Sequence, residues 1–204
     1  MVTAARQDAV VWHWLGRVAY DRVLADQLAL RERVWAGEPG AVLLCEHPPV
    51  ITLGRSANRA NVLDAGDVPV VQIERGGDVT YHGPGQLMIY PIVRVTSVVG
   101  FLSAIAGALA QAAATFGVPG AEFRRDPAGL WLGDAKLAAC GIHIARGVSV
   151  HGWALDVATP TEAWQRIRPC GLSVPQISIT RAGRAVTVEE FAACAGPLVS
   201  RALL

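Results

Sequence analysis

The chain alternates between stretches with helical spacing of apolar residues and stretches with strand-like spacing. From Tyr20 to Trp35 the apolar positions recur every three or four residues, which predicts an amphipathic helix that stops at Gly37. The next apolar run, 41–45, is short and continuous, as in a buried strand, and two prolines break it. Further strands are predicted at 50–53, 70–74 and 87–95, and in a long hairpin, 130–145 with 148–157, that turns at Arg146-Gly147.

Three more helices complete the pattern. An uncharged helix is predicted from about Val98 to Phe116, and a short one from Thr161 to Arg168. A final helix opens at Thr187-Val-Glu-Glu190 with the spacing of a capping box. Strands and helices interleave without a regular βαβ rhythm, which favours an α+β fold with a mixed, largely antiparallel sheet flanked by helices. We expect one domain over residues 1–204, because this length supports one full core and no linker or repeat interrupts it.

One segment, 95–121, has no charged residue and is long enough to cross a bilayer. Alanine and glycine dominate it, Ser103, Gln111 and Thr115 lie inside it, and a Gly-Val-Pro-Gly turn ends it. We therefore expect a buried helix packed on a sheet and no membrane span. The N-terminal residues lack the apolar run of a signal peptide, and the four cysteines have no paired spacing, which indicates a reducing, cytoplasmic compartment.

The balance of charges narrows the candidate chemistry. A net charge of +1 gives no overall field for nucleic acid, and no zinc-type spacing links the cysteines to the histidines, so no metal is expected. Lys136 is the only lysine among 18 basic residues. Burial can tune a lysine, unlike an arginine, until it releases a proton, so Lys136 is a candidate for proton chemistry. The alternative is that one lysine persists by chance in an arginine-rich composition.

The segment from Arg75 to Gln86 holds four glycines in twelve residues. Its glycines permit tight turns at which main-chain N–H groups approach a ligand, and Tyr81 and His82 supply an aromatic wall and a hydrogen-bonding edge. The spacing matches neither a phosphate-binding loop nor a dinucleotide fingerprint. The alternative is a pair of hairpin turns with His82 as a core residue whose hydrogen bonds are satisfied.

A second candidate is the turn Arg168-Pro-Cys-Gly171, which exposes the thiol of Cys170. A thiol after a helix C-terminus meets the negative end of the dipole, so a cation must favour the thiolate. Lys136 can supply that cation, lower the thiol pKa by roughly one to three units and relay protons during acyl transfer. The alternative for Cys170 is a small buried apolar residue, as we expect for Cys45 and Cys194.

Several motifs occur in one order along most of the chain and carry a family resemblance. They are Glu46-His-Pro-Pro-Val50, Thr52-Leu-Gly-Arg55, Arg75-Gly-Gly with Val79-Thr-Tyr-His-Gly-Pro-Gly-Gln86, Lys136-Leu-Ala-Ala-x-Gly141, His151-Gly with Ala154-Leu155, and Pro169-Cys-Gly171. Together they closely resemble the lipoyl(octanoyl) transferases of the lipoate-protein ligase B type. The fold implied is that of the catalytic domains of biotin and lipoate ligases, in agreement with the α+β pattern.

The resemblance implies a reaction and its partners. An octanoyl group moves from octanoyl-acyl carrier protein to a lysine of lipoyl domains, in the first step of protein lipoylation, without ATP or another cofactor. The acceptors implied are the lipoyl domains of 2-oxoacid dehydrogenases and the glycine cleavage H protein, with no nucleic acid or membrane. Cys170 carries the acyl group and Lys136 lowers its pKa. The implied substrate pocket is lined by Arg75, Gly76, Gly77, Asp78, Val79, Thr80, Tyr81, His82, Ala139, Cys140, Gly141, Gly152, Trp153 and Ala154.

Two positions depart from the family pattern, and other functions stay open. Asp156 stands where the family has asparagine and is expected to hold Lys136 protonated; Cys140 replaces an aliphatic residue and is expected to pair with Cys170 on oxidation. The rivals are an ATP-dependent lipoate or biotin ligase, a non-catalytic carrier-binding module and a cysteine hydrolase. Exposed arginines are candidate contacts for the acidic carrier protein, namely Arg55, Arg59, Arg124, Arg125 and Arg146.

Overall fold

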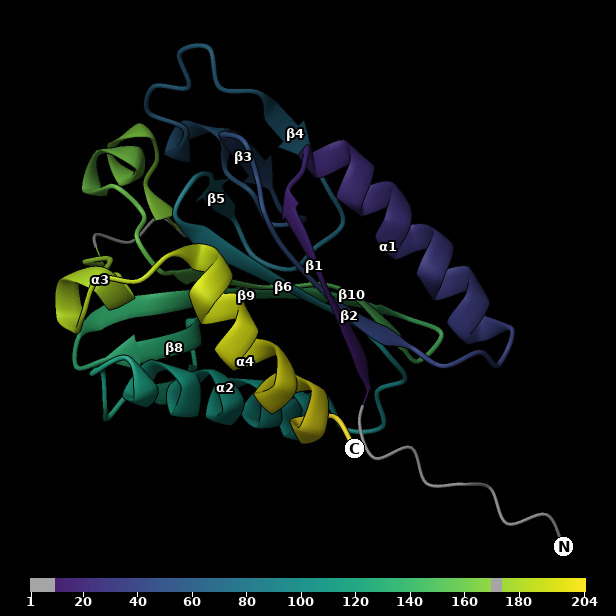
Figure 1. Ribbon diagram of the computed structural model, residues 1–204. Helices are drawn as coiled ribbons and strands as arrows, with labels where there is room; N and C mark the ends of the chain where they lie inside the picture. The colour runs from purple at the N-terminus through teal and green to yellow at the C-terminus, as the bar shows by residue number, and fades with distance from the viewer. Residues whose placement is uncertain (1–9, 170–173) are drawn as a thin grey trace, which may run out of the picture.

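The structure, a computed structural model, describes residues 10–169 and 174–204 of the chain (Figure 1). The strands in these residues are β1 (Val11–Arg17), β2 (Ala41–Glu46), β3 (Val50–Leu53), β4 (Val70–Gln72), β5 (Val79–His82), β6 (Gln86–Ile92), β7 (Glu122–Arg125), β8 (Ala128–Leu132), β9 (Ala135–Ala145) and β10 (Val148–Asp156). The helices are α1 (Tyr20–Trp35), α2 (Val98–Thr115), α3 (Ile179–Ala182) and α4 (Val188–Ala202), with 3-10 turns η1 (Arg59–Asn61) and η2 (Thr161–Arg166).

A seven-stranded sheet with the order β1-β2-β6-β10-β9-β8-β7 forms the centre of the molecule. β1 pairs with β2 in parallel, and every other pair in this sheet is antiparallel. The predicted α+β class with a mixed, largely antiparallel sheet is therefore confirmed. A smaller sheet, β4-β3-β5, lies beside it and holds the glycine-rich segment.

The hairpin of β9 and β10 is the longest strand pair and turns at Arg146-Gly147, as predicted. Both turn residues have positive φ, 49° and 76°, which matches the right-handed twist of the strands that they join. The expected first strand of this hairpin began too early. Residues 128–132 form β8, a separate strand, because Gly133 (φ 56°) and Asp134 make a second turn there.

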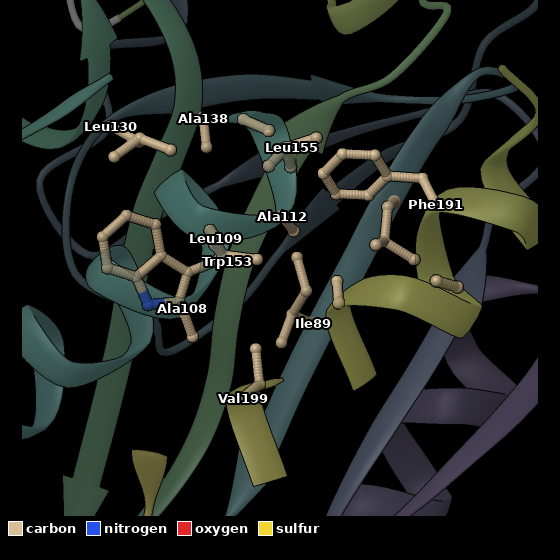
Figure 2. Close-up of a cluster of buried hydrophobic side chains, with 14 of the residues drawn as sticks. Ile89, Ala108, Leu109, Ala112, Leu130, Ala138, Trp153, Leu155, Phe191 and Val199 are labelled. Carbon is tan, nitrogen blue, oxygen red and sulfur yellow. The ribbon is translucent and has the colours of Figure 1, made fainter. Parts of the chain in front are cut away.

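One face of the large sheet is covered by α2 and α4 and is packed with apolar side chains (Figure 1). Figure 2 shows this layer, in which Ile89, Trp153 and Leu155 of the sheet meet Leu109 of α2 and Phe191 of α4. Although α2 is long and apolar enough to cross a membrane, its buried residues pack here, as predicted. The capping box at Thr187 is also confirmed, with the Glu190 N–H donating to Thr187 Oγ1 at 3.2 Å.

The opposite face is covered by α1 (Figure 1) and has a different composition. A smaller apolar cluster there includes Val23 of α1 and Met88 of β6. Several buried polar side chains lie in this half of the molecule or in the small sheet, including Gln27, His47, Thr52, Arg75, His82 and His151. The buried polar residues expected at the site, such as Arg75 and His82, therefore lie away from the apolar layer.

Three predictions of local structure were wrong or incomplete. The helix expected at 161–168 is the 3-10 turn η2, which ends at Arg166. β1 and β7 were missed, and β1 with α1 and β2 forms one βαβ unit that a search for a repeated rhythm does not detect. β5 was missed because the flanking glycines look like loop residues, although Val79–His82 pairs with β3 along its whole length.

Candidate functional site

A cavity of about 400 Å³ lies between the glycine-rich segment and the strands β9 and β10. Its size is within the range of roughly 300–1,000 Å³ that is common for small-ligand sites, and apolar surface dominates its lining. Lys136 and most of the residues expected at the site form part of its wall: Arg75, Gly76, Gly77, Asp78, Val79, Thr80, His82, Ala139, Cys140, Gly141, Gly152, Trp153 and Ala154.

Among the expected residues that the structure describes, Tyr81 is not in that wall. Tyr81 packs away from it, within the apolar cluster of Ile51 and Leu53, with its ring 6.1 Å from that of Trp164. Cys170 lies outside the described residues, as do Gly171 and the two residues after it. Its described neighbour Pro169 lines the cavity, and so does Gln176.

Lys136 reaches the cavity because of an irregularity in β9. Leu130 of β8 pairs with Ala138, but the next residue, Trp131, pairs with Lys136, so β9 contains one extra residue, Leu137. A regular ladder would place Lys136 on the same side as Ala138, which packs into the apolar layer under α2. The β-bulge instead turns Lys136 to the other face, as bulges beside active sites commonly do.

The stem and the ammonium of Lys136 are held by β8. Gly129 leaves room for the stem, since a Cβ there would lie 3.2 Å from Lys136 Cε and 2.4 Å from the Ala138 carbonyl oxygen. The Nζ atom lies 4.9 Å from the centre of the Trp131 ring, in a cation–π arrangement. The side chain is only 6% exposed, so its charge lies in an environment where electrostatic interactions are strong.

The backbone of Lys136 is also joined to the chain that follows Cys170. The Lys136 N–H donates to the Pro175 carbonyl at 2.8 Å, and the Ile177 N–H donates to the Lys136 carbonyl at 3.0 Å. Lys136 and Gln176 thus form an isolated parallel bridge. This bridge fixes one end of the segment that contains the expected nucleophile directly beside the expected proton carrier.

Arg75 organises the glycine-rich segment. Its Nη1 donates to the Gly76 carbonyl at 3.0 Å, and its Nη2 donates to the carbonyls of Asp78 at 2.7 Å and Thr52 at 2.8 Å. Gly77 has φ 86°. A Cβ added at Gly54 would lie 2.2 Å from the carbonyl oxygen of Gly77. The guanidinium therefore shapes the cavity wall by binding backbone carbonyls, in addition to lining the cavity itself.

A chain of buried hydrogen bonds continues from Arg75 through the sheet. Arg75 Nε donates to Thr52 Oγ1 at 3.2 Å, and Thr52 Oγ1 lies 3.2 Å from His82 Nε2. His82 Nδ1 lies 2.8 Å from Gln86 Oε1, and Gln86 Nε2 donates to Asp156 Oδ1 at 3.0 Å. Because Gln86 Oε1 can only accept, His82 Nδ1 carries the proton and its Nε2 accepts from the Thr52 hydroxyl.

Burial shifts the pKa of both titratable groups in this chain towards the neutral form. It lowers the pKa of His82 to about 3, and it raises the pKa of Asp156 to about 7 against the opposing hydrogen bonds of Gln86 and Thr159. The Thr159 hydroxyl donates to Asp156 Oδ1 at 2.7 Å. Gln86 and Thr159 are thus the hydrogen-bond partners of Asp156, and its expected effect on Lys136 stays a prediction.

Two glycines bring β9 and β10 close to their neighbours. Gly141 and Gly152 face each other across the hairpin. A Cβ at Gly152 would lie 1.9 Å from the Ile89 carbonyl oxygen, and one at Gly141 would lie 3.1 Å from the Gly76 carbonyl oxygen. Their missing side chains let the glycine-rich segment lie directly against the hairpin and leave the floor of the cavity open.

His151 is a wall residue that the sequence-based list of pocket residues omitted. It has φ 60° inside a strand, an unusual conformation for a residue other than glycine, and its N–H donates to Gln27 Oε1 of α1 at 2.8 Å. Burial lowers its pKa to about 4, so the imidazole is neutral near pH 7. The signal that pointed to it was the His-Gly motif, which was noted but not interpreted as a binding residue.

Pro169, in the wall, belongs to the cysteine motif that the sequence pointed to. Other wall residues carried no recognisable sequence signal, because they come from elements that are distant along the chain. They are Tyr20, Met88, Tyr90, Leu102, Asp126, Pro127, Ala128, Ile142, Trp164 and Gln176. Cys140 has an expected place in the wall, and burial raises the pKa of its thiol to about 12 although Lys136 opposes this shift. Cys45 is fully buried, as expected, and Cys194 is partly buried.

Comparison with known proteins places this arrangement in a family. The model of the lipoyl protein ligase A/B catalytic domain matches residues 18–195. An octanoyltransferase of Gloeobacter violaceus is 39% identical over 184 residues, which are 88% of this chain and 78% of the relative. An octanoyltransferase of Geobacter metallireducens is 42% identical over 165 residues, which are 78% and 76% of the two chains.

The fold has a counterpart among solved structures. A crystal structure of lipoate-protein ligase A bound with ATP superposes with a TM-score of 0.80, covering 95% of this chain and 85% of that chain. At 14% identity this likeness concerns the fold, and it confirms the ligase-like architecture expected from the sequence. With the sequence matches, it shows that the chain belongs to the lipoyl protein ligase A/B catalytic domain family and, within it, to the octanoyltransferases, which are acyltransferases.

Proposed function

We propose that the chain transfers an octanoyl group from octanoyl-acyl carrier protein to the target lysine of lipoyl domains, through a thioester on Cys170. The observation that carries this proposal is the position of Lys136. It is buried at the wall of an apolar cavity, and its backbone binds the segment that directly follows the cysteine motif. A nucleophile needs a nearby base and an acyl site, and this proposal is supported by a lysine and an apolar cavity whose wall includes Pro169, the residue before Cys170 in the chain.

The reaction takes place in two balanced steps. Lys136 in its neutral form accepts the Cys170 proton, and the thiolate attacks the thioester carbonyl of the donor. The carrier thiolate leaves and takes a proton from the Lys136 ammonium, so the acyl group rests on Cys170. The neutral Lys136 then takes one proton from the acceptor's ammonium, and the resulting amine attacks this thioester. An amide forms, the second amine proton goes to the Cys170 sulfur, and Lys136 releases its proton to solvent. Neither step consumes ATP, because an amide is more stable than the thioester that it replaces.

The cavity suits the acyl group. Burial of the tail contributes about 0.8 kcal/mol per methylene, so eight carbons give a substantial binding energy in a largely apolar wall. The glycines of the 75–85 segment and the facing Gly141 and Gly152 keep side chains out of the space beside Lys136. We infer that the tail lies against the wall residues 76–80 and 139–142, that one domain carries the whole activity, and that the enzyme works in the cytoplasm.

The decisive experiment is to mix the purified protein with octanoyl carrier protein, without ATP, and to follow its intact mass. We expect one octanoyl adduct that hydroxylamine removes and that disappears when a lipoyl domain is added, with the appearance of octanoylated domain. Cys170→Ser is expected to abolish the thioester, whereas Cys194→Ser, a control in α4, is expected to retain it. A requirement for ATP would support a ligase, and an adduct that turns over to free octanoate without an acceptor would support a hydrolase.

A further inference from the structure

A second cavity, of about 380 Å³, adjoins the acyl cavity. The two cavities share three wall residues, Trp164, Pro169 and Gln176. Since Pro169 directly precedes Cys170 in the chain, the shared wall stands next to the position of the nucleophile. The second cavity is therefore placed where a group attached to the acyl carbon would leave the first one.

The second cavity combines apolar and basic groups. Leu63, 53% exposed, and Ile167 give it an apolar side. The exposed Arg168 and Thr161 lie on its wall, and Arg181 Nη1 of α3 donates to Thr161 Oγ1 at 2.6 Å, which brings a second guanidinium to the same rim. Glu162, next to Thr161 in the chain, is exposed and is not part of the wall.

We propose that this second cavity, lined by Leu63, Thr161 and Arg168, binds the 4′-phosphopantetheine arm of the acyl donor, with the arm's phosphate at Arg168 and Arg181. This inference rests on the proposed function, because it assumes that a thioester donor delivers the acyl group to Cys170. The arm is a flexible chain of amides and methylenes with a thiol at one end and a phosphate at the other. Walls with apolar and polar groups suit its methylenes and amides. Guanidinium groups suit its phosphate, which they bind in a bidentate manner.

The charge of the second cavity selects the donor rather than the acceptor as its occupant. The acceptor's lysine is cationic until it reacts, so a path between Arg168 and Arg181 would repel it. A phosphate gains charge-assisted hydrogen bonds on the same path. The acyl chain in the first cavity and the arm in the second would then meet at the shared wall of Trp164, Pro169 and Gln176, where the thioester bond is broken.

The test compares donors with and without the phosphate in the first half-reaction. The rate of acyl-enzyme formation is measured with octanoyl-pantetheine, octanoyl-4′-phosphopantetheine, octanoyl-coenzyme A and octanoyl carrier protein. For the unaltered protein we expect kcat/KM to be about tenfold higher with the phosphate than without it, as for one charge-assisted hydrogen bond. Arg168→Gln and Arg181→Gln are each expected to remove most of that advantage, so that the ratio of kcat/KM between phosphorylated and unphosphorylated donors falls towards one. Arg201→Gln, an exposed arginine in α4, is the matched control and is expected to change nothing.

The outcomes separate the arm from other contacts. Equal losses with the carrier protein, coenzyme A and phosphopantetheine donors support an arm site, since all three share that group. A loss confined to the carrier protein would assign the arginines to a protein surface and overturn the inference, as would equal rates for phosphorylated and unphosphorylated donors. If no donor forms an acyl-enzyme with the unaltered protein, the proposed function fails instead, so the two failures are distinguishable.

Discussion

The two faces of the seven-stranded sheet do different work with different residues. Under α2 and α4 the layer is apolar, and side chains such as Phe191, Leu109 and Trp153 are fully buried in it. On the face towards α1 and the small sheet, smaller apolar clusters are accompanied by buried polar or charged side chains, among them Arg75, His82 and Lys136. Apolar burial on the first face stabilises the fold. Burial of polar groups on the second face costs free energy and holds those groups in fixed positions out of water.

This difference separates the residues that mainly determine stability from those that are expected to determine activity. Many polar groups on the α1 side have specific partners, as in the chain from Arg75 to Asp156, so their positions are determined within narrow limits, whereas Gln27 Nε2 and His151 Nδ1 are buried without a hydrogen-bond partner among the described residues. Such networks rigidify a site when they are complete and are costly when one member is removed. Substitutions on the two faces should therefore separate into those that change stability and those that change activity.

The largest effect is expected for Lys136→Arg on the polar face. The arginine keeps the positive charge but does not release its proton, so acyl transfer should fall by about 10²–10⁴-fold, the usual contribution of a general acid or base. We expect the midpoint of urea unfolding to change little. The measurement is the single-turnover rate of acyl-enzyme formation and of transfer to a lipoyl domain.

Full activity in the Lys136→Arg protein would show that this residue supplies charge alone. A large loss of stability would instead show that the substituted side chain no longer fits over Gly129. It would contradict the expectation that substitutions on this face change activity and leave stability unchanged. Lys136→Gln, which removes the charge with a shorter side chain, is the companion variant. If only the charge matters, Gln is defective and Arg is active.

The apolar face is probed by Phe191→Ala in α4. Phe191 is fully buried and its ring lies 5.2 Å from that of Phe116, so its truncation should lower the free energy of unfolding by about 3–5 kcal/mol. The rate per folded molecule should stay within about twofold, because no atom of α4 lines the cavity. Urea unfolding and titration of active molecules measure the two quantities, with Phe191→Leu as the milder control. A loss of rate per folded molecule would contradict the expectation that residues of the apolar face affect stability alone.

The smallest effect is expected for Asp156→Asn, which should change how the free energy of unfolding depends on pH. Burial raises the folded-state pKa of Asp156 to about 7, above its ordinary value of 3.8, so the folded protein holds a proton that the unfolded chain releases. Stability from this group is therefore present at pH 4 and is lost as the pH rises to about 7. Asn removes that slope, and the variant should gain about 2–4 kcal/mol over the unaltered protein at pH 8 but not at pH 4.

Urea unfolding of both proteins between pH 4 and pH 8 measures this difference. The buried neutral histidines His82 and His151, with lowered pKa values, destabilise both proteins below about pH 6.5 and cancel in the comparison. Parallel curves over the whole range would show that Asp156 is charged throughout in the folded protein. A change in the pH profile of acyl transfer, with stability held above the transition, would support the expected effect of Asp156 on Lys136, and an unmoved profile would contradict it.

The sequence was sufficient for most elements and for about half of the residues of the cavity wall. Apolar spacing predicted α1, α2, α4, β2 and the β9–β10 hairpin, because these elements bury one continuous face each and carry clear end signals such as Gly37 and Thr187. The motifs brought together Lys136 and the glycine-rich segment. These successes depend on local patterns, which a single sequence displays directly.

The remaining features depend on contacts between distant segments, so no local pattern reports them. The extra residue Leu137 in β9 is visible only from its pairing with β8, and the hydrogen bonds of Asp156 and Thr52 are visible only when β3, β5, β6 and β10 are assembled. Short strands between glycines, such as β5, look like loops because their stability comes from their neighbours. The second cavity arises in the same way, from Leu63 and Arg168, residues that are distant along the chain.

The bulge in β9 lets two consecutive residues, Leu137 and Ala138, pack into the apolar layer while Lys136 lines the cavity. Deletion of Leu137 would leave the lysine opposite Trp131 in an uninterrupted ladder, but it would remove a fully buried side chain from that layer. Length, as much as residue identity, is therefore under constraint along β9. An insertion or deletion there is expected to lower the free energy of unfolding more than a conservative substitution does.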